Sequence, residues 1–150
     1  MRIGDIMTTK VETIAPTELA ETARDRMHAD NIRHLVVIDG KNVVGVISDR
    51  DLGGTQADET KLAQQTVADL MHKHPITTTP HATIRDAANL LRGYVIGCAP
   101  VLDGDRLVGI VTTTDVLDLV GRGAERPVDQ AKRWTLKHRG PRQQKSRRPR

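Results

Sequence analysis

The apolar positions of this chain form two similar runs of about fifty residues each. Each run contains two short apolar segments joined around an Asp-Gly dipeptide, at residues 35–38 and 43–47 in the first run and at 100–102 and 107–111 in the second. Asp-Gly between apolar segments is a strong signal for a β-hairpin. Continuous rather than alternating apolar residues indicate strands covered on both faces. The pattern therefore predicts two buried hairpins.

A helix is expected before each hairpin, because apolar residues recur there at spacings of three and four. The stripes consist of Ala20, Ala23 and Met27 in the first run and of Ile84, Ala87, Ala88 and Leu91 in the second. Each helix follows an extended segment that ends at Pro16 or Pro80, since the residue before proline avoids the helical region. Thr17 and Thr83 are predicted as the N-caps.

A second helix is expected after each hairpin, starting near Ser48 or Thr112. In the second run, Leu117 and Val120 are predicted to form the buried side of this helix. In the first run, Gly53-Gly54 occupies the corresponding place, which predicts a short or broken helix.

The two runs are copies of one repeat. Residues 3–52 align on residues 67–116 at a constant offset of 64, and 12 of these 50 positions are identical. Each copy has the order β-α-β-β-α, and one such unit is too small to bury a stable core alone. The sequence therefore predicts an α/β fold in which two repeats, related by a pseudo-two-fold axis, pack sheet against sheet around a shared core.

Charge separates the repeats from the end of the chain. Residues 1–121 hold 12 Lys/Arg and 17 Asp/Glu, a net charge of −5, whereas residues 122–150 hold 11 and 2, a net charge of +9. The expected organisation is a first repeat at 1–58, a second repeat at 59–121 that includes a linker at 59–66, and a basic, partly disordered tail at 122–150.

Composition bounds the compartment and the chemistry. Phe is absent, so the core is aliphatic, and the single cysteine, Cys98, cannot form an internal disulfide. No apolar run follows Met1, and no stretch reaches the ~20 apolar residues of a membrane helix. These features predict a cytoplasmic protein with no membrane partner.

The pair His72 and His74 has no third ligand in view, so no metal site is expected. No catalytic constellation or phosphate-binding glycine motif is present, and an enzyme is not expected.

The chemistry with the clearest local signal lies where each hairpin ends. Ser48 and Thr112 stand between a strand and a helix, a place where backbone N–H groups and the positive helix end attract anions. Asp51 and Asp115 follow three residues later and offer acceptors for vicinal hydroxyls. The alternative interpretation is that Ser48 and Thr112 are N-caps and that the aspartates favour the first-turn dipole.

These motifs resemble the CBS domain family (cystathionine-β-synthase-type repeats), paired as a Bateman module. The resemblance spans residues 3–120. It is carried by Asp5-Ile6-Met7 with Asp69-Leu70-Met71, by the Asp-Gly hairpins, and by two copies of one longer motif, Gly45-Val46-Ile47-Ser48-Asp49-Arg50-Asp51 and Gly109-Ile110-Val111-Thr112-Thr113-Thr114-Asp115. Each motif alone is weak, but the ordered set occurring twice is specific.

The resemblance implies that an adenosyl ligand (AMP, ADP, ATP, S-adenosylmethionine or a dinucleotide such as NAD) binds in a cleft between the repeats, with no obligatory cofactor. Family roles carried over by motif give ribose contacts to Asp51 and Asp115, phosphate contacts to Ser48, Thr112, Thr114, Arg33, His34 and Arg50, and contacts near the base to Thr13 and Thr77. The second repeat has Gly97-Cys98 where the first has Arg33-His34, which predicts one phosphate-competent cleft and one neutral cleft. Arg33 and Arg50 as solvated surface charges are the alternative.

The expected function is a non-catalytic regulatory module that forms a homodimer and signals to a partner. The alternative is a nucleic-acid-binding protein that acts through residues 122–150, with the repeats as a dimerisation scaffold. The resemblance does not cover this basic tail, which equally fits an acidic protein partner, the acidic body of a dimer mate or a solubilising terminus.

Overall fold

The computed structural model describes residues 1–122, so the tail predicted at 122–150 lies outside the described residues except for Arg122. Along the chain the elements are α1 (Ile3–Ile6), β1 (Thr13–Ile14), α2 (Ala20–Asp30), β2 (His34–Asp39), β3 (Asn42–Ser48), η1 (Gly54–Gln56), α3 (Glu59–Leu62), α4 (Val67–Leu70), β4 (His72–Lys73), α5 (Ile84–Gly93), β5 (Cys98–Asp103), β6 (Arg106–Thr112) and α6 (Thr113–Arg122). Within residues 1–122, no helix is long and apolar enough to cross a bilayer.

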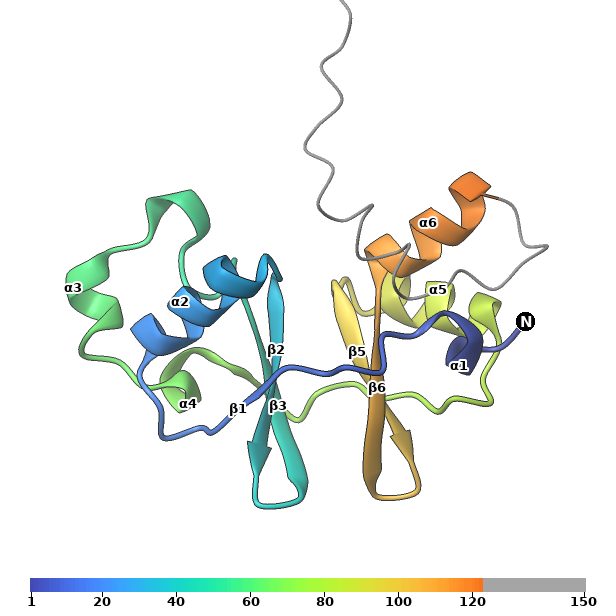
Figure 1. The fold of residues 1–150 in the computed structure, drawn as a ribbon, viewed down its shortest axis with the longest axis horizontal. Coiled ribbons are helices and arrows are strands. Elements are labelled where there is room, and N and C mark those ends of the chain that lie inside the picture. The colour runs from blue at the N-terminus through green and yellow to red at the C-terminus, as the bar shows by residue number, and fades with distance from the viewer. Residues whose placement is uncertain (123–150) are drawn as a thin grey trace, which may run out of the picture.

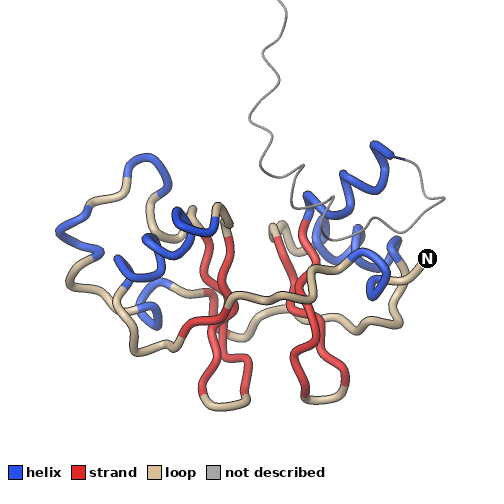
Figure 2. The backbone as a smooth tube through the Cα atoms, viewed as in Figure 1, coloured by secondary structure: helices blue, strands red, loops and turns tan. Residues whose placement is uncertain are grey.

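Two β-hairpins stand side by side in the middle of the molecule, with the helices on their outer faces (Figure 1, Figure 2). In the first repeat the strand order is β1-β2-β3-β4, with β1 parallel to β2 and the other pairs antiparallel. In the second repeat β5 pairs with β6 in the same register, 64 residues later. Gly40 and Gly104 have φ +62° in the turns, which is the left-handed conformation that the Asp-Gly dipeptides predict. The predicted pair of α/β repeats is confirmed.

The first segments of the two repeats are exchanged. Helix α1 begins the first repeat but packs on the second, where the N–H groups of Ile3 and Gly4 donate to the carbonyls of Ala82 (2.8 Å) and Pro80 (2.9 Å). Helix α4 does the reverse through Val67 and Ala68, which donate to the carbonyls of Glu18 (2.8 Å) and Pro16 (3.0 Å). Both donor pairs and both acceptor pairs are separated by 64 residues. The hydrogen bonds thus repeat the pseudo-two-fold relation predicted from the sequence.

A glycine in each hairpin makes room for the exchanged segment. A Cβ atom on Gly109 would lie 2.5 Å from Met7 Sδ and 3.1 Å from Thr8 O, and one on Gly45 would lie 2.7 Å from Met71 Sδ. Both glycines are buried in strands, so the close backbone approach, rather than a phosphate loop, explains them.

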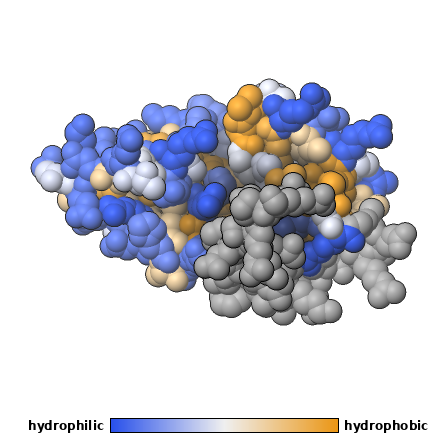
Figure 3. All heavy atoms as spheres, turned by 90° about the horizontal axis from the view of Figure 1, so that it is seen from above, coloured by the Kyte–Doolittle hydropathy of each residue, from blue (hydrophilic) through white to orange (hydrophobic). Residues whose placement is uncertain are grey.

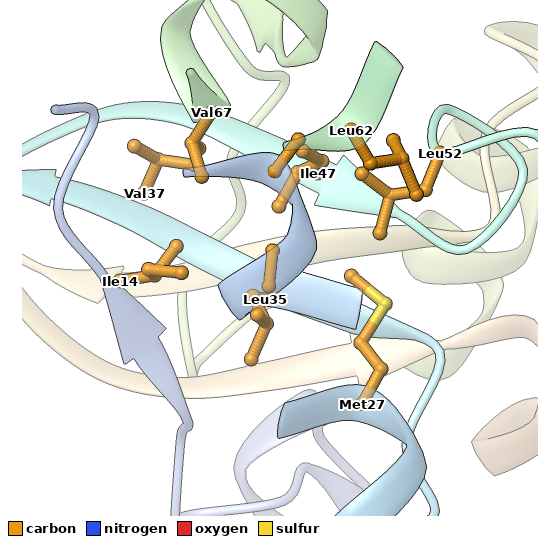
Figure 4. Packing of buried hydrophobic residues seen from close by; sticks show 10 residues of the cluster. Ile14, Met27, Leu35, Val37, Ile47, Leu52, Leu62 and Val67 are labelled. Atoms are coloured by element: carbon orange, nitrogen blue, oxygen red, sulfur yellow. The ribbon is translucent and has the colours of Figure 1, made fainter. Parts of the chain in front are cut away.

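Three apolar clusters fill the molecule. One lies between α2 and the first hairpin and also takes in Leu52, Leu62 and Val67 (Figure 4). A second lies between α5, α6, α1 and the second hairpin. The third joins the inner faces of the two hairpins and consists of Val36, Val46, Cys98 and Ile110. The hairpins are therefore covered on both faces, and the repeats share the predicted central core.

Two local predictions are wrong. Leu117 and Val120 are 63% and 74% exposed, and the buried residues of α6 are Asp115 and Leu119. The N-cap of α2 is Leu19 rather than Thr17, because Leu19 pairs with Thr66 in an isolated β-bridge and the α2 amide of Ala20 donates to the carbonyl of Gln65 (2.8 Å). Thr83, in contrast, caps α5 as predicted, accepting from the N–H of Asp86 at 3.1 Å. The broken helix at Gly53-Gly54 is also confirmed.

Candidate functional site

Each hairpin ends in a reciprocal pair of hydrogen bonds between a hydroxyl residue and an aspartate. In the first repeat, the N–H of Ser48 donates to Asp51 Oδ2 (2.8 Å), and the N–H of Asp51 donates to Ser48 Oγ (3.2 Å). In the second repeat, Thr112 and Asp115 form the same pair at 2.9 and 3.1 Å. Such a box fixes both side chains and satisfies N–H groups that the turn leaves open. In the second repeat this pair stands at the start of α6, as predicted for an N-cap, whereas in the first repeat a turn rather than a helix follows Ser48.

The two aspartates differ in their surroundings. Asp115 is 2% exposed, whereas the side chain of Asp51 is 17% exposed. His72 Nε2 lies 3.9 Å from Asp51 Oδ1. In the second repeat the position corresponding to His72 is Thr8, which pairs with Ile110 in an isolated β-bridge. The repeat-1 motif therefore has an imidazole beside its carboxylate, and the repeat-2 motif has a threonine at the matching position.

His72 is an exposed residue, with a side chain 77% accessible, and sequence analysis did not include it among the site residues. The structure places it in β4, antiparallel to β3 and opposite Val46. A signal was available, because His72 and Thr8 are 64 residues apart and follow corresponding Asp-x-Met segments. Only the exchange of segments, however, brings His72 to the first repeat.

Cys98 of the central core is influenced by both aspartates. Burial raises the pKa of the Cys98 thiol to about 12, and the negative charges of Asp51 and Asp115 act in the same direction. Cys98 is therefore close enough to feel both carboxylates, one from each repeat. A buried thiol with a raised pKa is a packing residue rather than a nucleophile.

His34 marks the boundary between the repeats. A Cβ atom added to Gly97 would lie 2.9 Å from His34 Nε2, so the imidazole of the first repeat rests against the backbone of the second. Gly97 stands where the first repeat has Arg33. Their carbonyl groups accept equivalent hydrogen bonds. Arg33 O accepts from the N–H of Asp49 (2.9 Å), and Gly97 O accepts from the N–H of Thr113 (3.0 Å).

The remaining predicted site residues lie on five different segments. Arg50 and Thr114 are exposed and directly precede Asp51 and Asp115, and Arg33 is exposed at the start of the first hairpin. Thr13 lies half-buried in β1 opposite Val36, and its carbonyl accepts a hydrogen bond from the guanidinium of Arg26. The exposed Thr77 precedes Thr78, which bridges to Val101. The structure thus brings together Ser48 with Asp51 and Thr112 with Asp115. A ligand contact for any of these residues stays a prediction.

No metal centre competes for these side chains within residues 1–122, where no three His, Cys, Asp or Glu groups are arranged as ligands. A depression of about 210 Å³ on the outer side of the first repeat is lined by residues of α2 and α3, among them Glu21, Asp25 and His28. None of the predicted site residues lines it.

The family model of the CBS domain matches this chain twice, at residues 3–52 and 67–122. The chain belongs to the CBS domain family. A CBS domain-containing protein of Dictyostelium discoideum is 31% identical over 130 residues, which cover 79% of this chain and 90% of the relative. The matched residues thus include both repeats and the exchanged segments α1 and α4.

Solved structures of CBS pairs share this fold. The CBS domain pair of protein MJ0100, solved with 5-methylthioadenosine and S-adenosyl-L-methionine, is 28% identical, with a TM-score of 0.72, and the match covers 81% of this chain and 97% of that one. CBSX2, solved with AMP, is 29% identical, with a TM-score of 0.71, and the match covers 83% and 98%. Two CBS pairs with the fold of this chain are therefore known to hold adenosyl ligands.

Proposed function

We propose that this chain is a non-catalytic, cytoplasmic regulatory module that binds an adenosyl ligand at the boundary between its two CBS repeats. The observation that carries the proposal is the pair of hydroxyl–aspartate boxes, one in each repeat. Each box holds a carboxylate in a fixed position, and the partly exposed carboxylate of Asp51 can accept the hydroxyl protons of a ribose. The adenosyl ligands of MJ0100 and CBSX2 support the same ligand class.

The two boxes differ in charge, and this difference predicts different ligands. The first has Arg50 before its aspartate and His72 3.9 Å from the carboxylate, which suits a phosphate group. The second has Thr114 and Thr8 at the matching positions, and Gly97 in place of Arg33. We therefore expect AMP, ADP or ATP at the first box. An adenosyl compound without phosphate, such as S-adenosylmethionine, is expected at the second.

Ligand-induced thermal shifts test the proposal. AMP, ATP, NAD and S-adenosylmethionine are titrated against the wild type, Asp51→Asn, Asp115→Asn and the control Asp39→Asn, which changes an exposed aspartate of the β2–β3 turn. Each site variant should lose ten- to a hundredfold in affinity, since a hydrogen bond to a charged group contributes roughly 1.5–3 kcal/mol. AMP should respond mainly to Asp51→Asn. No shift with any adenosyl compound at millimolar concentration would contradict the proposal.

A regulatory module must pass the effect of ligand binding on to another protein. The proposal therefore includes a homodimer that signals to a partner. Its basis is the family resemblance together with the absence of catalytic motifs from the sequence.

A second candidate function, nucleic-acid binding, is favoured by the charge of +9 on residues 122–150 against −5 on residues 1–121. Each neutralised phosphate of duplex DNA contributes about −0.9 to the slope of log K against log salt. Five contacts therefore give a slope of about −4.5 under the same rule. Removing residues 123–150 should abolish a gel shift with RNA or DNA and leave the thermal shift with AMP intact. Absence of any gel shift at low salt would remove this candidate.

A further inference from the structure

One carboxylate oxygen of helix α6 is buried without a partner. It is Oδ2 of Asp118, which accepts no hydrogen bond, on a residue that is half-buried as a whole. A buried carboxylate oxygen loses its hydration, and this cost is offset only where a donor or a cation replaces the water. Asp118 is therefore suited to a positively charged partner.

The described part of the chain does not supply that partner. The ion pairs of residues 1–122 involve Glu12, Asp51 and Glu59, and none of them includes Asp118. Arg122 lies four residues further along α6, a spacing at which side chains of one helix can pair, but it is exposed and is not among these ion pairs. Residues 112–121 hold two aspartates and no basic residue. The charge of Asp118 is thus left for another molecule.

Asp118 lies one helical turn after Asp115, the aspartate of the second hydroxyl–aspartate box. Residues three apart on a helix are neighbours, with Cβ atoms about 5–6 Å apart. Asp115 is 2% exposed and already accepts the N–H of Thr112 at 2.9 Å. Asp118 is the more accessible of the two carboxylates. A ligand at the second box would therefore be close to the negative charge of Asp118.

The first repeat has no counterpart of this carboxylate. At the offset of 64, Gly54 takes the place of Asp118. The first box instead has cationic groups nearby, since Arg50 directly precedes Asp51, and His72 Nε2 lies 3.9 Å from the Asp51 carboxylate. The two boxes thus differ in the sign of the charge that accompanies them. Positive groups stand beside the first box, and an additional negative group stands beside the second.

The surroundings of α6 strengthen the effect of a single charge. Val116 and Leu119 of this helix pack in the second core. Seen from above, apolar residues gather on the half of the molecule formed by the second repeat, whereas the first-repeat half is mostly hydrophilic (Figure 3). Opposite charges attract each other more strongly where apolar atoms replace water. One carboxylate can therefore decide which ligand the second box prefers.

We propose that the second box selects an adenosyl ligand with a positively charged substituent at its 5′ carbon, and that Asp118 contacts this charge. The inference rests on the proposed function, which places an adenosyl ligand at Asp115, and it names the charge that this site distinguishes. S-adenosylmethionine carries a sulfonium and an ammonium on this substituent. In 5-methylthioadenosine the substituent is uncharged, and in AMP it is a phosphate that two neighbouring carboxylates would repel.

Paired titrations of the full chain measure the contact as a difference between two ligands. S-adenosylmethionine and 5-methylthioadenosine are titrated by calorimetry, with and without Asp51→Asn, which weakens the first box. The wild type should prefer S-adenosylmethionine by about tenfold or more, because the contact is a charge-assisted one. Asp118→Asn should lower the affinity for S-adenosylmethionine by about ten- to a hundredfold and change that for 5-methylthioadenosine by less than about twofold.

Two further variants serve as controls. Asp105→Asn removes the same charge from the exposed β5–β6 turn and should keep the wild-type preference. Asp118→Glu keeps the charge and should retain part of the preference. Asp118→Asn should fold normally, because it removes a charge that has no partner in the ligand-free protein, and a thermal melt checks this.

S-adenosylhomocysteine assigns the contact within the ligand, because it keeps the ammonium and lacks the sulfonium charge. An affinity that depends on Asp118 supports a contact with the ammonium, and binding like that of 5-methylthioadenosine supports a contact with the sulfonium. A wild type that binds S-adenosylmethionine no better than 5-methylthioadenosine would overturn the inference. An unchanged preference in Asp118→Asn would also overturn it, and in both cases the adenosyl site itself would stand. If neither compound nor AMP binds, the proposed function is wrong as well.

Discussion

The hydroxyl–aspartate box of the second repeat should contribute measurably to stability, independent of any ligand. Asp115→Ala removes the acceptor of the Thr112 N–H, a 2.9 Å hydrogen bond to a carboxylate on a residue that is 2% exposed. A hydrogen bond to a charged group contributes roughly 1.5–3 kcal/mol, so we expect a loss of about 2 kcal/mol. For a domain of this size, that lowers the melting temperature by about 8 °C.

The first repeat provides the comparison. Asp51→Ala removes a bond of similar length (2.8 Å), but the side chain of Asp51 is 17% exposed, and Gly53-Gly54 follows instead of the ten-residue α6. Water can replace part of the lost interaction, so we expect about half the effect, near 1 kcal/mol. Asp115→Asn keeps an oxygen acceptor and should recover most of the loss.

Ligand-free thermal melts and urea unfolding measure both variants. We expect stability to decrease from the wild type to Asp51→Ala and then to Asp115→Ala. The reasoning from burial is refuted if Asp115→Ala melts at the wild-type temperature, or if Asp51→Ala loses more stability than Asp115→Ala.

Other substitutions test the packing. Gly109→Ala places a Cβ atom 2.5 Å from Met7 Sδ and should destabilise the fold by roughly 1–3 kcal/mol in urea unfolding, whereas Gly93→Ala, with open space around it, should be neutral or stabilising. Cys98 should resist alkylation at pH 8 in the folded protein, since burial raises its pKa to about 12, and should react once the protein is unfolded, as mass spectrometry can show. Val95→Asn should stabilise the protein by up to about 1 kcal/mol in thermal melts, because asparagine tolerates φ +53°.

Much of the fold follows from local patterns in the sequence. The Asp-Gly turns, the continuous apolar strands and the offset of 64 predict two hairpins with helices and a shared core, and the structure confirms them. Each of these features depends on residues close together in the chain or on a gap-free repeat. Thr83 could be predicted as a cap for the same reason.

The failures involve contacts that a local pattern does not encode. Both faces of α6 have apolar residues at helical spacing, so periodicity alone could not choose between Leu117 with Val120 and Val116 with Leu119. The choice is made by the box of Thr112 and Asp115, which orients the first turn with Asp115 inward. The prediction of Thr17 as the N-cap of α2 is wrong because the helix start binds a distant segment. The N–H of Ala20 donates to the carbonyl of Gln65, and Leu19 pairs with Thr66.

The candidate site could also be predicted only in part, where its contacts are local in the chain. The pairs Ser48 with Asp51 and Thr112 with Asp115 lie within one turn, and their association was visible in the sequence. His72 reaches Asp51 through the exchange of segments, and Gly97 accommodates His34 across the repeat boundary. Sequence reasoning about one repeat at a time could not find either contact.

The exchange of α1 and α4 also bears on how such a chain could arise. The first segment of each repeat binds to the other repeat, since Ile3 and Gly4 donate to Ala82 and Pro80, and Val67 and Ala68 donate to Glu18 and Pro16. An ancestor with one repeat would therefore have folded fully only as a dimer, in which the leading residues of each chain packed on the other chain. Joining the two genes would make this exchange permanent within one chain, and the copies could then diverge, as Asn31 and Gln56 differ from Val95 and Val120.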